Sequence, residues 1–113
     1  MVDWVPMHAN RPLLHDALRE RFGLGEGGYI GSDNTNVEGL SNYLHGYASN
    51  VSDAAGLAIA AGVDQDMPGG AYLSLAPLVR SGRVPLSHVD RAAANVLDGL
   101  RATPTLLAIA YGW

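Results

Sequence analysis

The sequence contains no cysteine, so neither a disulfide framework nor a thiolate metal site is available to it. Charged residues make up only 16% of the chain, and together with a hydrophobic content of 48% this argues against a disordered polypeptide. No stretch approaches the roughly 18 uninterrupted apolar residues that a membrane span requires. The 113 residues are therefore expected to form one domain at most, or part of one.

The charge balance also gives no reason to expect certain partners. The formal net charge is -4, which favours neither a nucleic acid nor an anionic membrane surface as a partner. The first six residues, Met1–Pro6, lack the basic and apolar regions of a signal peptide, and the sequence alone leaves the localisation unknown.

Apolar residues at three- and four-residue spacing predict several helices. These helices are expected over about residues 11–22, 36–45, 52–61, 71–81 and 85–100. Two short segments, 29–30 and 63–67, are predicted to be strands. The order helix, strand, helix, helix, strand, helix, helix is typical of βα units, so we expect an α/β fold that is mostly helical with about two short parallel strands. Two strands are too few for such a sheet, which indicates an incomplete version of the fold.

The segment Gly28–Glu38 contains the first candidate for a working residue. A short apolar run ends abruptly in Ser-Asp-Asn-Thr-Asn, which places Asp33 at the carboxyl tip of a predicted strand, where α/β folds usually carry their chemistry. An aspartate there can attack an anomeric carbon while a second carboxyl about 5 to 5.5 Å away protonates the leaving oxygen. The alternative is that Asp33 caps the next helix or closes a turn.

Other candidate sites have less support in the sequence. The four histidines, at positions 8, 15, 45 and 88, lack the close pairing of a helical zinc motif, which favours surface or capping roles. Asp64 and Asp66 alternate as in a cation-binding loop, but the glycine and terminal glutamate of an EF-hand are missing. The glycine-rich segment 25–28 precedes its strand, whereas a phosphate loop follows one. We therefore expect no metal and no cofactor.

A series of short motifs is shared, in order and spacing, with one enzyme family. The motifs are Val5–Asn10, Leu13-Leu14, Leu18-Arg19, Phe22-Gly23, Gly31–Asp33, Val37-Glu38, Ala60–Gly69, Gly82–Pro85 and Val89–Ala92. In this set, which extends from about Val5 to Leu100, the chain resembles the end of the N-terminal barrel domain of glycoside hydrolase family 3, the β-glucosidase and β-xylosidase family. The resemblance implies a partial (β/α)8 TIM-barrel fold.

The resemblance also implies roles for individual residues. The family's Ser-Asp motif carries the nucleophile of a retaining, two-step hydrolysis, and that role falls on Asp33. Asp64 and Asp66 are implied to have a structural or site-lining role, and His8 and Asn10 to organise a loop. The implied substrate is a β-linked glucoside or oligosaccharide, with the preferred sugar and linkage left open.

The departures from the family imply a fragment. The earlier strands that hold the sugar, and the later region that generally supplies the acid/base, have no counterpart in the chain. Residues 1–101 are therefore expected to be a fragment of the barrel domain, with little hydrolysis by themselves, and residues 102–113 a divergent apolar tail. Family members are often periplasmic or secreted.

A second hypothesis comes from a different class of protein. A non-catalytic helical interaction module derived from the same fold would use its apolar helix faces, and the tail, to bind a protein partner or to self-associate.

Overall fold

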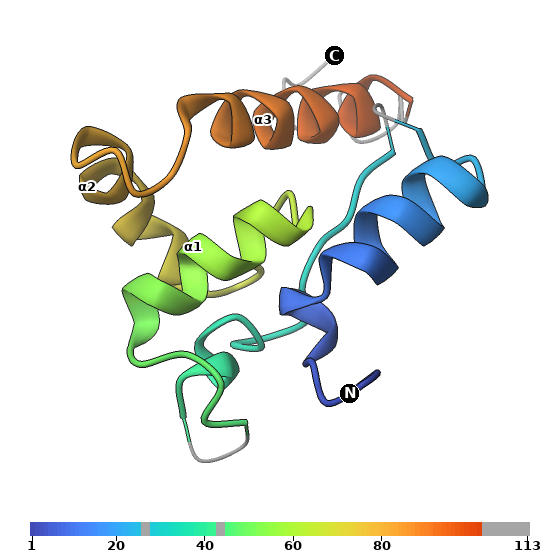
Figure 1. Cartoon of the computed structure of the whole chain (residues 1–113). Helices are drawn as coiled ribbons and strands as arrows, with labels where there is room; N and C mark the ends of the chain where they lie inside the picture. The colour runs from blue at the N-terminus through green and yellow to red at the C-terminus, as the bar shows by residue number, and fades with distance from the viewer. Residues whose placement is uncertain (26–27, 43–44, 103–113) are drawn as a thin grey trace.

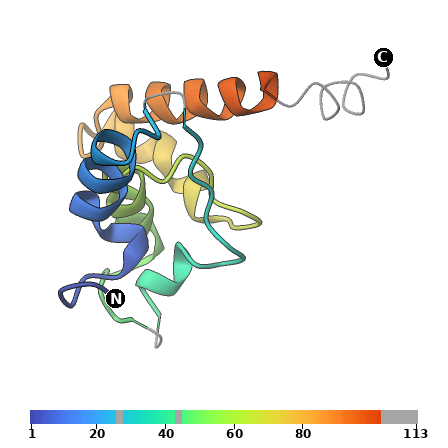
Figure 2. The ribbon, with the colours of Figure 1, turned by 90° about the vertical axis from the view of Figure 1, so that its right-hand side faces the viewer.

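In the computed structural model, which describes residues 1–25, 28–42 and 45–102, the chain folds around one central helix (Figure 1). The helical elements are η1 (Met7–Ala9), η2 (Pro12–Arg21), η3 (Glu38–Leu40), α1 (Val51–Ala61), η4 (Ala71–Ser74), α2 (Leu75–Arg80) and α3 (Leu86–Arg101). α3 lies across one end of the molecule above α1, as both side views show (Figures 1 and 2). Among the described residues, no helix has the length and apolarity to cross a membrane.

The central helix α1 is defined by a polar residue at its start and a glycine at its end. The Asn50 side chain accepts a hydrogen bond from the Asp53 amide at 2.9 Å, so the helix begins at Val51, one residue before the Ser52-Asp53 start that the sequence predicts. It ends at Gly62, whose φ of 114° lies in the left-handed region that glycine favours. Its alanine-rich face is buried, which lets neighbouring elements approach closely.

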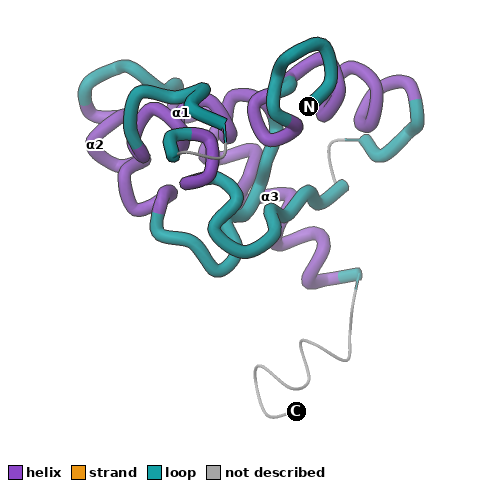
Figure 3. Tube along the Cα trace, turned by 90° about the horizontal axis from the view of Figure 1, so that it is seen from below, coloured by secondary structure: helices purple, strands orange, loops and turns teal. Residues whose placement is uncertain are grey.

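The prediction of two short parallel strands is wrong in extent. Segments around Gly31 and Gln65 do pair in parallel, but only through one isolated bridge, and Figure 3 shows helices and loops without strands in the described part of the chain. The amide of Ser32 donates to Gln65 O at 2.8 Å, and Ile30 O accepts the Asp64 amide at 2.7 Å. A pair of segments without flanking strands is marginal, because a stable sheet generally needs three or more strands.

The predicted helix over residues 36–45 is also much shorter than expected. Only η3 (Glu38–Leu40) is helical, and residues 43–44 lie outside the described part. The amides of Tyr47 and Ala48 both donate to Leu40 O at 2.8 Å, so the chain folds back directly after η3. Gly46, with a φ of 55° in the left-handed region that glycine favours, allows this reversal in place of a longer helix.

The remaining helices lie at their predicted positions in the sequence, but two of them differ from the continuous α-helices that the sequence predicts. The helix over 71–81 is divided into η4 and α2, and Pro77 near the junction has no amide to continue the hydrogen-bond series. The helix over 11–22 is present as η2 but is wound as a π-helix, in which the Phe22 amide donates to Ala17 O at 2.8 Å. α3 matches its prediction closely.

The hydrophobic core surrounds α1. Its largest fully buried side chains include Val37 and Leu40 from the η3 region, Ile59 from α1 and Val63 just after it. α3 contributes less, since only Ala92 and Asn95 are buried on it. The predicted apolar tail, residues 102–113, lies outside the described residues except for its first member.

Candidate catalytic site around Asp33

Asp33 directly follows the segment that pairs in parallel with residues 64–65. The pairing holds Ser32 in place: its amide binds Gln65 O, and its buried hydroxyl oxygen accepts the Met67 amide at 3.0 Å. The chain therefore emerges from the paired segment immediately before Asp33. This is the position at the carboxyl tip of a strand segment that the sequence predicts, although the pairing is a single bridge.

The carboxylate of Asp33 is exposed, and the backbone turns sharply after it. Asp33 Oδ1 accepts the Asn34 amide at 2.6 Å, and Asp33 O accepts the Asn36 amide at 3.2 Å. Thr35 has a φ of 54°, in the left-handed region that non-glycine residues seldom adopt. Asp33 thus closes a turn, with its side chain and its carbonyl oxygen both accepting backbone amides.

Two carboxylates accept amides at the start of η4, and one of them, Glu38, connects the segment after Asp33 to the loop that follows the second paired segment. Glu38 Oε1 accepts the amides of Gly70 and Ala71 at 2.6 and 3.2 Å. Asp66 Oδ2 accepts the Tyr72 amide at 3.3 Å. These bonds satisfy amides at the start of η4 that have no partner within the helix. Through Glu38, the start of η4 is held against the segment that follows Asp33.

The other carboxylate oxygen of Glu38 and of Asp66 does not accept a hydrogen bond from the described part of the chain. Within the described residues, Glu38 Oε2 and Asp66 Oδ1 are buried without a hydrogen-bond partner. Burial raises the pKa of Asp66, and the neighbouring Glu38 carboxylate raises it further, against the opposing hydrogen bond from Tyr72. Asp66 is therefore easier to protonate than an ordinary aspartate.

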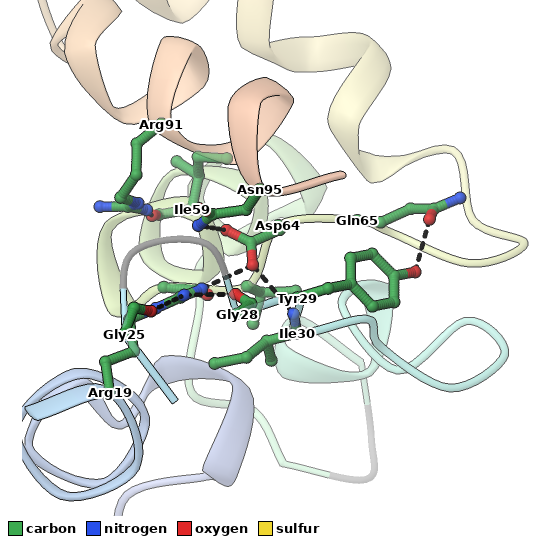
Figure 4. Close-up of polar contacts among 12 residues, drawn as sticks. Arg19, Gly25, Gly28, Tyr29, Ile30, Ile59, Asp64, Gln65, Arg91 and Asn95 are labelled. Carbon is green, nitrogen blue, oxygen red and sulfur yellow. Dashed lines mark hydrogen bonds and ion pairs between the residues drawn. The ribbon is translucent and has the colours of Figure 1, made fainter. Parts of the chain in front are cut away.

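Asp64 is the centre of a buried polar network, drawn in Figure 4. Its Oδ2 accepts hydrogen bonds from Arg19 Nη2 at 2.5 Å and from the Ile30 amide at 2.9 Å, and its Oδ1 accepts one from Asn95 Nδ2 at 3.0 Å. The guanidinium of Arg19 also donates to the carbonyl oxygens of Gly25, Gly28 and Gly62. With both oxygens engaged by protein donors, Asp64 is arranged to hold η2, the paired segments and α3 together.

The Val5–Asn10 motif lies at the start of η2. Asn10 Oδ1 accepts the Leu13 amide at 3.0 Å, as a capping asparagine does, and its amide group donates to Val2 O at 3.3 Å. His8 is half-buried. Burial lowers the pKa of His8, His45 lowers it further, and the Asp33 carboxylate acts in the opposite direction.

Three polar residues that organise this region were not expected from the sequence in these roles: Arg19, Glu38 and Asn95. Arg19 is buried although its sequence neighbours Glu20 and Arg21 are exposed, and its partner Asp64 is 45 positions away. The sequence pattern around Arg19 does not predict its partner, because the two residues meet only after their helix and loop have packed together.

Two partly buried histidines, His8 and His88, give the chain a defined pH dependence. Burial is the main cause that lowers the pKa of His8 and of His88 below 6.5, so below that pH the unfolded chain takes up protons before the folded chain does. Stability is therefore expected to fall as the pH decreases through about 6.5. The measurement is the urea midpoint at about pH 7 and about pH 5 for the wild type and H88Q, in which the decrease should be smaller. A parallel decrease in both proteins would contradict this assignment to His88.

Comparison with known proteins places this geometry in a glycosidase family. Residues 1–98 match the family model for the glycosyl hydrolase family 3 N terminal domain. The β-xylosidase of Formosa agariphila is 35% identical over 101 residues, a match that covers 82% of this chain and 14% of the relative. The chain belongs to glycoside hydrolase family 3.

Solved structures agree with that assignment. A β-glucosidase from Erythrobacter marinus is 41% identical with a TM-score of 0.76, and the match covers 85% of this chain and 12% of the other. A β-glucosidase from Listeria innocua in complex with glucose is 32% identical with a TM-score of 0.80, and there the match covers 92% and 15%. The chain thus spans less than one sixth of the length of these relatives and is similar to one part of their N-terminal domain.

Proposed function

We propose that Asp33 is the catalytic nucleophile of a retaining β-glycoside hydrolysis. The observation that carries this proposal is an exposed carboxylate placed immediately after a parallel-paired segment, in a chain of glycoside hydrolase family 3. The hydrogen bond from the Asn34 amide to Asp33 Oδ1 supports the role, because it orients the carboxylate and leaves its other oxygen available for attack.

The proposed chemistry has two steps. In the first, an Asp33 oxygen forms an ester bond to the anomeric carbon while the bond to the leaving oxygen breaks and an acid group protonates that oxygen. In the second, the same group acts as a base and takes a proton from a water molecule that attacks this carbon, the ester bond breaks and the Asp33 carboxylate is regenerated. We assign no described residue of this chain as the acid/base, which in this proposal comes from another part of the enzyme.

We also propose that the fold is part of a (β/α)8 barrel. The pairing of Gly31 with Gln65 is parallel, and α1 lies between the two segments in the chain, which is the connection of a βαβ unit. In such barrels the functional loops follow the carboxyl ends of the strands, and both Asp33 and the loop containing Asp66 follow the paired segments.

The substrate class that fits best is a β-linked glucoside, xyloside or short oligosaccharide. This rests on the names of the relatives, a β-xylosidase and two β-glucosidases, one of them bound to glucose. The side chains described around Asp33 do not decide between these sugars.

Hydrolysis by this chain alone is expected to be negligible. General acid catalysis contributes about 10² to 10⁴-fold and positioning of the sugar contributes more, and the described residues supply neither group of interactions. The measurement is turnover of an aryl β-glucoside and an aryl β-xyloside by the purified chain. Turnover above the buffer rate that D33N abolishes would contradict the expectation of inactivity.

A complementation experiment tests the nucleophile itself. The chain is mixed with the remaining part of the domain from the Listeria innocua β-glucosidase and treated with a 2-fluoro glycoside, which traps the glycosyl ester. Mass spectrometry of peptides should then find the label on Asp33, with no label in D33N and unchanged labelling in D98N, where an exposed aspartate on α3 is altered. A label on another carboxylate would disprove the assignment.

A second candidate function, a non-catalytic interaction module, is favoured by one observation. Leu86, Leu97 and Leu100 on α3 are 58%, 54% and 39% exposed, an unusual set of large apolar side chains on one helix. A concentration-dependent dimer in size-exclusion chromatography, lost in L97S, would support self-association through α3. A monomer at all concentrations would argue against it.

A further inference from the structure

Three potential metal ligands meet on the outer face of η2, in a part of the molecule that the proposed hydrolysis does not use. They are His15, Asp16 and Glu20, and one ligand atom from each lies within 4.8 Å of the other two. His15 Nδ1 is 3.0 Å from Asp16 Oδ1 and 3.6 Å from Glu20 Oε1. The imidazole therefore faces both carboxylates.

The π-helical winding of η2 is the reason these side chains meet. In an α-helix, with 3.6 residues per turn, residues five positions apart point about 140° away from each other. In a π-helix the hydrogen bonds connect residues five apart, as the bond from the Phe22 amide to Ala17 O shows, so His15 and Glu20 lie on the same side. Zinc motifs on α-helices place their ligands three or four residues apart. A search of the sequence for that spacing therefore misses His15 and Glu20, which are five residues apart.

We propose that His15, Asp16 and Glu20 bind a divalent transition metal ion such as Zn²⁺. Zinc lies about 2.0 to 2.2 Å from nitrogen and oxygen ligands, so two ligands of a tetrahedral site are about 3.4 Å apart. The two measured separations from His15 Nδ1, 3.0 and 3.6 Å, lie on either side of that value. Small rotations of the carboxylates are enough to place all three atoms around one ion.

Burial and surroundings support the same site. The side chain of His15 is only 17% exposed and so is held by the protein, whereas those of Asp16 and Glu20 are 57% and 66% exposed and are free to adjust. A shallow hollow lined in part by Asp16, Glu20 and Arg21 adjoins the cluster and leaves room for a water molecule as the fourth ligand. Arg21, next to Glu20 in the sequence, also lines this hollow.

The ligand set also predicts selectivity. One imidazole nitrogen with two carboxylate oxygens suits Zn²⁺ and its first-row neighbours. Mg²⁺ prefers an octahedral shell of oxygen atoms and keeps most of its water, so it is expected to bind weakly here. The site is separate from Asp33, so its presence or absence leaves the proposed nucleophile unaffected.

Calorimetric titration of the full chain with ZnCl₂ tests this proposal. We expect one zinc ion per chain, no measurable heat of binding with MgCl₂, and an affinity lower by at least about tenfold in H15Q and in E20Q. The matched controls H88Q and D98N should bind zinc as the wild type does. Circular dichroism establishes which variants are folded, and E20Q decides the question if H15Q unfolds, because Glu20 is largely exposed.

Either of two results would overturn the proposal. One is a wild-type affinity for zinc equal to that of folded E20Q. The other is an equal loss of affinity in H88Q, which would place the ion at a different histidine.

Discussion

Replacing Asp64 with alanine is expected to destabilise the chain by about 3 to 5 kcal/mol, because it leaves the Arg19 guanidinium charged and buried without its counter-ion. The side chains of this pair are 2% and 0% exposed, so water does not replace the lost carboxylate. The Ile30 amide and the Asn95 side chain lose their acceptor at the same time. The free energy of unfolding measured by urea denaturation is the appropriate test.

The control for this experiment is D98A. Asp98 is half exposed and pairs with Arg101, which is 75% exposed, within one helix, so its loss should change stability by less than about 0.5 kcal/mol. An apolar replacement of both partners, R19M with D64L, should recover part of the stability lost in D64A, since no buried charge remains. A loss in D64A as small as that in D98A would mean that the buried pair contributes little.

Ile59→Ala is expected to cost about 2 to 5 kcal/mol, through lost burial and the cavity that remains in a well-packed core. Ile59 is 1% exposed and belongs to the central helix α1. Leu57 on the same helix is 38% exposed, so L57A removes a side chain of equal size from a much less buried place. The comparison of the two variants by urea denaturation measures the packing around α1 directly.

The decisive result for this prediction is the ratio of the stability lost in L57A to the stability lost in I59A. L57A should lose less than half as much stability as I59A, because alanine favours the helix and little apolar area is uncovered. Equal losses would show that the core does not surround α1 as described.

The parts of the structure that follow from local chemistry were predictable. The alanine-rich pattern of α1, closed by Gly62, and the apolar spacing of α3 indicate these helices at nearly the right boundaries. The position of Asp33 after a paired segment was also predictable, because a short apolar run followed by polar turn formers has few other interpretations. Its role as the nucleophile remains a prediction.

The parts that depend on distant partners were not predictable. The strands shrink to one bridge because their stability depends on neighbours and not on their own residues. The burial of Arg19 depends on Asp64, far along the chain, and the meeting of His15 with Glu20 depends on a winding that the apolar pattern does not specify.

The hydrogen bond between the Asp64 carboxylate and the Ile30 amide has a consequence for the alignment of the two paired segments. A ladder of equivalent backbone bonds tolerates a slip by two residues, since each peptide group resembles the next. Here a side chain anchored by Arg19 and Asn95 selects one particular peptide group, and any slip would separate a buried charge from its donors. The alignment that presents Asp33 at the surface is therefore determined mainly by the buried Asp64 carboxylate and its donors. The backbone hydrogen bonds between the two segments contribute less.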